Sequence, residues 1–296
     1  MLRIGTSSWN YKSWESLIYT PGSGSSYLEQ YAQIYDSTEV DRWFWSLFDS
    51  PEPLLPDPAT AEEYARSVPE GFLFTIKVPN SITLTHHYHR DKSKPLRPNP
   101  HFLSPELFAS FLRSIEALKD HVGALIFQFE YLNKQKMSSQ AQFESRMESF
   151  FSTVETSYRC TVETRNPQYL NDRYFEFLRR NSLYPCFLQG YYMPNLRNIL
   201  PGRESWFTQG DLAVIRLHGP DRRGMERMTG KQWDQIVNPK DEEIEAILET
   251  IGRLLRRRVD VYLNVNNHYE GSAPLTIDKI RQRLPGIEGA GRRRLP

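Results

Sequence analysis

The sequence has little of what marks a secreted or membrane-bound protein. It contains two cysteines in 296 residues, Cys160 and Cys186, both within apolar segments, so we expect buried thiols rather than a disulfide or a metal site. No apolar run reaches the roughly eighteen residues that a membrane span needs. The first residues lack the apolar core of a signal peptide. We therefore expect a cytoplasmic protein that does not enter a membrane.

An excess of charge of either sign is also missing. The 37 Lys and Arg side chains nearly cancel the 36 Asp and Glu side chains, which leaves a net charge of +1. The field of the whole molecule therefore does not favour a polyanionic partner. Hydrophobic residues at 39% and charged residues at 25% indicate a globular protein able to bury a large core.

Short fingerprints of cofactor and metal sites are absent. The segment "GTSSWNYKSW" after the first expected strand lacks the glycine spacing of dinucleotide and phosphate loops, and no HExxH or Cys/His metal pattern occurs. No cofactor or metal site is therefore predicted. A divalent metal held by Glu39, Asp41, Glu163 and His218 is the minor alternative.

Strand-like and helix-like segments alternate along the chain. The expected strands lie in residues 2–8, 37–45, 71–79, 122–130, 158–166, 183–190, 212–220 and 259–267. The expected helices lie in residues 25–36, 60–68, 104–121, 138–154, 171–181, 241–258 and 273–284. Eight such strands at this length predict an α/β fold, a single-domain TIM (β/α)8 barrel, rather than an open doubly wound sheet.

Some segments stand outside this alternation. Residues 80–104 are rich in His, Pro and basic side chains and are predicted to form a long inserted loop. The helix expected in residues 191–209 has no clear bounds in the sequence, and we expect a basic loop before the helix at 241–258. Residues 286–296 are predicted to be a disordered basic tail, so the barrel is expected to span residues 1–285.

Polar side chains stand at the carboxyl end of nearly every expected strand, where TIM barrels carry their binding and catalytic groups. Glu39 and Asp41 are two residues apart and are expected on one side of their strand. The candidate ligand-binding residues are Ser8, Trp9, Glu39, Asp41, Trp43, Gln128, Arg165, Arg216, Asn266, Asn267, Gly271 and Ser272. A single polar residue at a strand end more often has a structural role. Charged residues gathered at one end of a barrel carry a desolvation cost unless they pair or bind something, so their convergence favours a shared pocket.

Seven segments carry a resemblance across about residues 2–284: "RIGTSSWNYKSW", "STEVDRWFW", "PEGFLFTIKVP", "GALIFQFE", "TVETRNPQYL", "VIRLHGP" and "NVNNHYEGSAP". In this order they resemble the domain-of-unknown-function-72 family, also called YecE-like, with "RLHG" and "NNHYEGSAP" as the most specific parts. The resemblance implies a TIM barrel and no established activity. Asp41 departs from the family pattern, which commonly has Asn there, and adds a negative charge.

The candidate chemistry is that of an enzyme acting on a small, polar, anionic ligand. Arg165 and Arg216 are expected to clamp a phosphate or carboxylate, and the backbone before the helix at 273–284, at Gly271 and Ser272, is expected to offer N–H groups to an anion. The candidate catalytic residues are Glu163 as general base, His218 as acid–base partner and Lys77 as a stabiliser of negative charge. Arg165, beside Glu163, is expected to keep that carboxylate ionised.

Two other readings remain open. A nucleic-acid-processing barrel, like a DNA-repair nuclease, would stack bases on exposed tryptophans (Trp9, Trp14, Trp43, Trp45) and hold phosphates with the basic insertion, although the net charge counts against it. A non-catalytic module that binds a sugar or nucleoside is the other. In every reading, Asn266 and Asn267 pin either their own loop or a ligand. The oligomeric state is not predicted.

Overall fold

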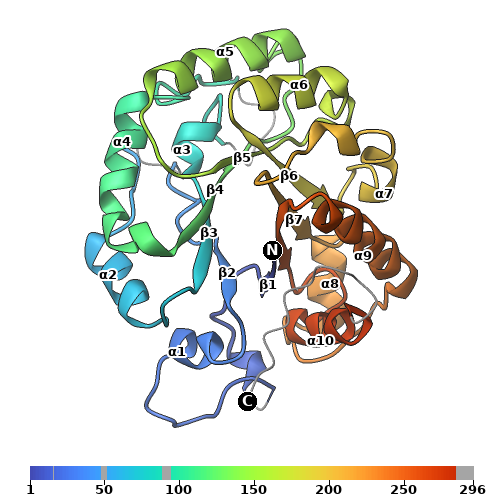
Figure 1. Cartoon of the computed structure of the whole chain (residues 1–296). Helices are drawn as coiled ribbons and strands as arrows, with labels where there is room; N and C mark the ends of the chain where they lie inside the picture. Colours follow the sequence, from blue (N-terminus) through green and yellow to red (C-terminus); the bar gives the residue numbers. More distant parts are fainter. Residues whose placement is uncertain (16, 48–51, 89–94, 285–296) are drawn as a thin grey trace. The chain divides into compact units, whose positions relative to one another are not determined.

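The strand order identifies the fold. The computed structural model of the chain describes residues 1–15, 17–47, 52–88 and 95–284. The sheet has the strand order β1-β8-β7-β6-β5-β4-β3-β2, and helices come between successive strands along the chain (Figure 1). This order and alternation are those of an α/β protein with a TIM (β/α)8 barrel, which confirms the fold predicted from the sequence.

The chain divides into two compact units, one formed by Met1–Glu39 with Tyr184–Pro296 and the other by Val40–Leu183. The first unit contains the strands β1 (Leu2–Thr6), β6 (Tyr184–Gln189), β7 (Leu212–Leu217) and β8 (Asp260–Val265), and β2 (Ser37–Val40) ends at its boundary. Its helices are α1 (Tyr27–Ala32), α7 (Leu196–Ile199), α8 (Arg222–Thr229), α9 (Asp241–Arg256) and α10 (Ala273–Arg283), with 3₁₀ turns η1 (Lys12–Trp14) and η4 (Glu204–Trp206).

The register of the parallel strands in this unit places particular residues side by side. Asn264 on β8 lies opposite Gly5 on β1 and opposite Arg216 on β7, and Arg216 in turn lies opposite Leu188 on β6. Gly5 is required by close packing, because a Cβ atom there would lie 1.9 Å from the carbonyl oxygen of Ser37. The register therefore fixes Arg216 and Asn264 as neighbours near the carboxyl ends of their strands.

Helix α9 illustrates why these segments are helical. Its apolar side chains recur at three- and four-residue spacing and are buried on one face, while the first turn is acidic and the last turn is basic, which suits the helix dipole. The buried apolar positions are Ile244, Ile247, Leu248, Ile251, Leu254 and Leu255. Helix α9 packs against α7 and β8.

The second unit contains the strands β3 (Leu73–Lys77), β4 (Val122–Gln128) and β5 (Cys160–Glu163). Its helices are α2 (Pro58–Arg66), α3 (Asn80–Thr83), α4 (Pro105–Ser114), α5 (Gln140–Thr153) and α6 (Asp172–Arg180), with 3₁₀ turns η2 (Glu116–His121) and η3 (Pro167–Tyr169). The strands are parallel, and the register places Gln128 opposite Glu163, so β4 and β5 end at the same level.

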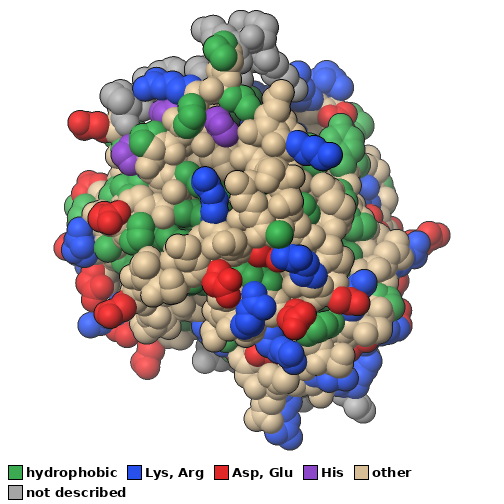
Figure 2. Space-filling model, turned by 90° about the horizontal axis from the view of Figure 1, so that it is seen from above, with side chains coloured by type: hydrophobic (Ala, Val, Ile, Leu, Met, Phe, Trp, Pro, Cys, Tyr) green, Lys and Arg blue, Asp and Glu red, His purple; other side chains and the backbone are tan. Residues whose placement is uncertain are grey.

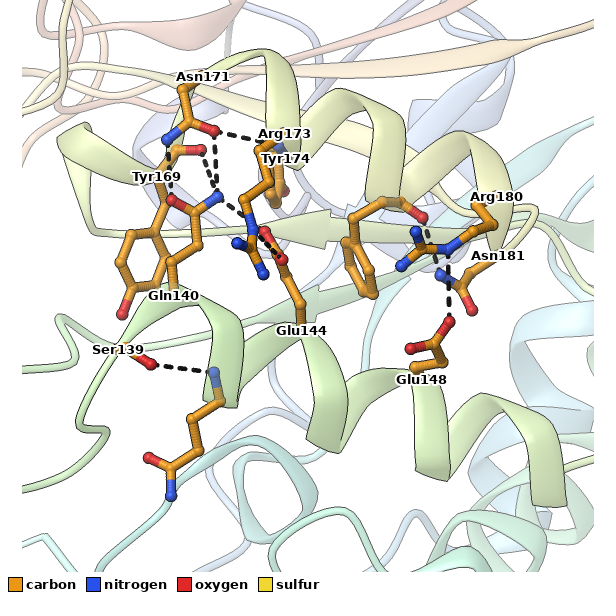
Figure 3. Close-up of polar contacts among 12 residues, drawn as sticks. Ser139, Gln140, Glu144, Glu148, Tyr169, Asn171, Arg173, Tyr174, Arg180 and Asn181 are labelled. Atoms are coloured by element: carbon orange, nitrogen blue, oxygen red, sulfur yellow. Dashed lines mark hydrogen bonds and ion pairs between the residues drawn. The ribbon is translucent and has the colours of Figure 1, made fainter.

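Polar contacts join helices α5 and α6, which lie side by side in this unit (Figures 1 and 3). Nε of Arg173 lies 2.6 Å from Oε2 of Glu144, and the amides of Gln140 and Asn171 exchange two hydrogen bonds of 2.8 and 3.1 Å. Asn171 also caps α6 by accepting a hydrogen bond from the backbone N–H of Tyr174. These contacts satisfy the groups at the start of α6 and have a structural role.

Three expectations about local structure were wrong. Strand β2 ends at Val40, so Asp41 follows the strand and does not share a strand face with Glu39. The expected loop at 80–104 begins with the short helix α3. The expected basic loop after β7 contains helix α8, which has few apolar residues but is capped by Asp221 and Gly230. Residues 89–94 of the insertion and the tail at 286–296 lie outside the described residues.

Candidate functional site

The first unit holds a buried charged cluster at the carboxyl ends of its strands. Arg216 directs Nε and Nη2 at the two carboxylate oxygens of Glu39, at 2.6 and 2.7 Å. Asn264 donates a third hydrogen bond to Glu39 at 3.1 Å. The side chains of Glu39 and Arg216 are 0% and 2% exposed. Arg216 was predicted to clamp the phosphate or carboxylate of a ligand. Its Nε and Nη2 instead bind the carboxylate of Glu39, a group of the protein itself.

Ser8, directly after β1, has an unusual backbone conformation. Its φ is +79°, which a residue with a Cβ atom rarely adopts. The conformation is held by a hydrogen bond from the Ser8 N–H to the Glu39 carbonyl (3.0 Å) and by one from the Thr6 hydroxyl to the Ser8 carbonyl (2.6 Å). Backbone strain of this kind clusters at functional sites. The contact with Glu39 places it beside the buried charged cluster.

His218 follows β7 directly and is buried, with its residue 8% exposed. Its backbone N–H donates to the carbonyl of Gln189, and its ring lies 5.8 Å from the ring of Tyr191, measured between centroids. Gly190 permits this approach, because a Cβ atom there would lie 1.9 Å from the His218 carbonyl oxygen. Tyr191 itself has a positive φ of 51°. The residues at and after the end of β6, Gln189 and Gly190, therefore pack closely against the backbone of His218.

A second histidine, His268, follows β8 and contacts helix α8. Nδ1 of His268 lies 2.5 Å from Oδ1 of Asn266, and Nε2 lies 3.3 Å from Oε1 of Glu226. Burial, and secondly the positive charge of Arg222, lower the pKa of His268, while Glu226 opposes the shift. The hydrogen bond from Arg222 lowers the pKa of Glu226. The pKa values of His268 and Glu226 are thus both held below their ordinary values.

Glu270, three residues before α10, is a buried anion of the protein itself. The carboxylate of Glu270 is fully buried and accepts from the Thr276 hydroxyl (2.8 Å), the Lys240 N–H (2.6 Å) and the Lys279 ammonium (2.7 Å). Through the N–H of Lys240, the N-cap residue of α9, Glu270 supplies the negative charge that the N-terminus of that helix favours. These bonds give Glu270 a structural role between α9 and α10.

The loop before α10 is closely packed. Asn267 accepts a hydrogen bond from the Ala273 N–H at 2.9 Å, which shows that its side chain pins the loop. A Cβ atom at Gly271 would lie 2.5 Å from the carbonyl oxygen of Gln235, and Ser272 is completely buried. These contacts give Asn267 and Gly271 structural roles, whatever else they do.

The second unit carries its own charged groups at strand ends. Glu163, the last residue of β5, is completely buried, and Nε of Arg165 lies 2.7 Å from its Oε1. Lys77 ends β3, and its ammonium group lies 3.8 Å from the centroid of the Phe44 ring, a cation–π contact. Gln128 ends β4, opposite Glu163 in register. Arg165 thus supplies the counter-charge that the sequence expected for Glu163.

Most of the tryptophans proposed for base stacking are not on the surface. Trp9, Trp14 and Trp43 are buried, at 7%, 0% and 8% exposure, while Trp45 is 48% exposed. The ring of Trp43 stacks on that of Tyr64, with centroids 5.5 Å apart. Asp41, two residues before Trp43, is partly exposed. The expectation of four exposed stacking tryptophans was therefore wrong, because three of the rings serve as core.

The surface shows no field of one sign on the face seen in Figure 2, where Lys and Arg side chains are interspersed with Asp and Glu side chains. Within the described ranges, no group of three or more His, Cys, Asp and Glu side chains is placed to hold a metal ion. No helix among the described residues is long and apolar enough to cross a membrane.

Sequence reasoning missed His268 and its partners on α8. The signal was present: His268 lies within "NNHYEGSAP", and Glu226 follows Arg222 at the four-residue spacing that pairs charges on one helix face. Recognising the helix from its caps would have placed Glu226 on a defined face near a strand end.

The strand order and the polar clusters at strand ends define an α/β barrel protein with buried charged groups where barrels bind ligands. Within that class the chain belongs to the DUF72 family, described as "Protein of unknown function DUF72", which matches residues 3–294. No curated protein matches the chain.

Two solved structures with this fold are also DUF72 family proteins. The one from Thermotoga maritima MSB8 is 19% identical, with a TM-score of 0.66 over 96% of this chain and 99% of the other. The one from Enterococcus faecalis V583 is 17% identical, with a TM-score of 0.64 over 95% of this chain and 96% of the other. At this level of identity the similarity supports the fold.

Proposed function

We propose that the chain is an enzyme that acts on a small, polar, phosphate- or carboxylate-bearing ligand by general acid–base chemistry at the carboxyl ends of its strands. The observation that carries the proposal is the buried Glu39–Arg216 pair with its strained neighbour Ser8. Burying two charges carries a desolvation cost of several kcal/mol for each ion, so their placement at strand ends is typical of a site rather than of a core.

In this proposal the buried pair orders the site, and other groups perform the chemistry. Arg216 and Asn264 fix the Glu39 carboxylate, and Glu39 in turn holds the Ser8 backbone through its carbonyl. His218, two residues beyond Arg216, is the acid–base group, because an imidazole titrates near neutral pH.

The second unit carries the other two predicted catalytic residues, Glu163 and Lys77, at the ends of its own strands. Glu163 is the general base, and its ion pair with Arg165 favours the ionised form that such a base needs. Lys77 stabilises negative charge that develops on the ligand. Its ammonium group rests on the Phe44 ring, which holds the long side chain in place.

A ligand panel tests the proposal. The purified protein is screened by thermal shift against inorganic phosphate, sugar phosphates and small carboxylic acids, and each stabilising compound is incubated with the protein and analysed for products by NMR. We expect stabilisation by anionic compounds and conversion of at least one of them. Binding without conversion would favour the non-catalytic module instead.

Variants then test the roles. We expect His218→Asn, Glu163→Gln and Lys77→Met each to lower turnover by at least about 100-fold, the usual contribution of an acid–base group or of a group that stabilises developing charge. The matched control is His121→Asn, which should leave turnover unchanged. His121 lies on η2, where its ring contacts the backbone carbonyl of Phe72. Turnover that is unchanged in all three variants would refute the assigned roles.

A further inference from the structure

The outer edge of the Arg222 guanidinium has no partner among the described residues. Arg222 begins helix α8, and its Nε donates a hydrogen bond of 2.8 Å to Oε1 of Glu226, one turn further along. In the described part of the chain, no group accepts a hydrogen bond from Nη1 or Nη2 of Arg222, and the side chain is 62% exposed. A guanidinium carries five N–H donors in one plane. The edge formed by the two Nη atoms is therefore available to a group from outside the protein.

The other edge of Arg222 is held by a chain of contacts that begins at the end of β8. Oδ1 of Asn266 lies 2.5 Å from Nδ1 of His268. Nε2 of His268 lies 3.3 Å from Oε1 of Glu226, and this oxygen also accepts from Arg222. The exposure of the side chains increases from 13% for His268 to 23% for Glu226 and 62% for Arg222. The guanidinium is thus held from the buried end of the chain, which lowers the entropy lost when a ligand binds.

Two tyrosines that follow other strands lie near the same guanidinium. The hydrogen bond to Glu226 is the main cause that raises the pKa of Arg222. The phenol groups of Tyr191 and Tyr11 add to the rise in pKa, so both lie within electrostatic reach of the guanidinium. Tyr11 follows β1, and Tyr191 follows β6 with a positive φ of 51°, a strained conformation of the kind that clusters at ligand sites. The ends of β1, β6 and β7 therefore all contribute to the surroundings of Arg222.

The stability of helix α8 does not account for Arg222. After the cap residue Asp221, the helix begins with Arg222 and Arg223, and its first turn contains no acidic side chain. A helix N-terminus carries a partial positive charge, so arginine side chains there are unfavourable. An Arg four residues before a Glu is also the less favourable order of such a pair. Two positive charges at this position therefore favour an anion from outside the protein.

Arg222 also lies near the acid–base group of the proposed function. The ring of Tyr191, whose phenol acts on Arg222, lies 5.8 Å from the ring of His218, measured between centroids. A Cβ atom at Gly219, the residue after His218, would lie 2.0 Å from the carbonyl oxygen of His268. The ends of β6, β7 and β8 are therefore packed together, and a ligand whose anionic group binds Arg222 can extend towards His218.

We propose that Arg222 binds the anionic group of the ligand, with its two Nη atoms donating parallel hydrogen bonds to two oxygens of a phosphate or carboxylate. The assignment rests on the proposed function for the class of ligand, and it gives Arg222 the role predicted for Arg216, whose guanidinium binds Glu39. Because Glu226 holds Nε, the bidentate edge of Arg222 is oriented before the ligand binds.

Titration with inorganic phosphate and with acetate at constant ionic strength, followed by amide NMR, tests the proposal. We expect saturable shifts that are largest at Tyr11, Tyr191 and Arg222. Arg222→Gln should raise the dissociation constant at least about 10-fold, because a charged bidentate contact is lost. The anion that binds more tightly identifies the group that the site takes, phosphate or carboxylate.

The matched control is Arg223→Gln, which removes the same charge from the same turn of α8 but leaves the guanidinium held by Glu226. It should change the dissociation constant by less than about 2-fold, because attraction between separated exposed charges is screened. Arg222→Lys keeps the charge without the planar fork, so its affinity should lie between those of the wild type and Arg222→Gln. The amide spectrum of each variant shows whether it is folded.

An absence of saturable shifts, shifts that are largest elsewhere, or equal dissociation constants in Arg222→Gln and Arg223→Gln would each overturn the proposal. These measurements follow binding without turnover. Their failure would leave the roles of His218, Glu163 and Lys77 to be judged by turnover alone, and a loss of those roles would leave the anion site at Arg222 in place.

Discussion

At the scale of single residues, the Glu39–Arg216 pair has the largest predicted effect on stability. Glu39→Gln keeps the size of the side chain but removes the charge opposite a guanidinium that is 2% exposed. Breaking a buried pair on one side typically costs about 3–5 kcal/mol of unfolding free energy. Urea denaturation followed by tryptophan fluorescence measures the change.

The control for this prediction is Glu249→Gln. Glu249 also pairs with an arginine, Arg253, at 2.7 Å, but its side chain is 66% exposed. Screening by water makes such a pair contribute about 0–1 kcal/mol. If the two substitutions had equal effects, the buried pair would have no special role in stability.

At the scale of elements, helix α8 depends on its caps more than on its packing. Oδ1 of Asp221 accepts the N–H of Gly224 at 2.9 Å, and Met225 is the buried residue of the helix. Asp221→Ala should therefore cost about 1 kcal/mol and should raise amide hydrogen exchange in α8 specifically. The matched change Asp57→Ala, at the cap of α2, should leave exchange in α8 unchanged.

The same helix shows where prediction from sequence succeeds and fails. Helices α4 and α9 were predicted because apolar residues recur at helical spacing, and Ser104 and Pro105 mark the start of α4. Helix α8 was missed because it lacks that periodicity, so only Asp221 and Gly230 indicate its ends. A polar helix is specified by its termini and by tertiary contacts, which periodicity does not detect.

At the scale of the whole molecule, the fold was predictable because the same strand–helix pattern repeats, and the helices that were not placed, α3, α7 and α8, do not change the count of strands. The contacts of the site were not predictable in this way. Glu39 and Arg216 are separated by 177 positions, and which side chains meet depends on rotamers and register. The expectation that functional residues lie at the carboxyl ends of strands located Glu39 and Arg216 near the ends of β2 and β7. It did not show that the two side chains bind each other.

Acid should destabilise the protein in two steps, and the first should come from histidines. Burial, and secondly Lys136 for His86 and Arg222 for His268, lower the pKa of both rings below the ordinary value of 6.5. The unfolded chain therefore binds protons at a higher pH than the folded chain does. Stability contributed by the neutral rings is full above pH 6.5 and is lost as pH falls from there through the folded pKa values.

The second step should follow at lower pH, where carboxylates such as Glu226, whose pKa is held below 4.5 by the hydrogen bond from Arg222, take up protons. Unfolding free energies from urea titrations at about pH 7.5, 5.5 and 3.5 resolve the two steps. The double substitution of His86 and His268 by Gln should remove the decrease between the first two pH values, while His121→Gln should retain it. A decrease that persists in the double variant would assign the first step to other groups.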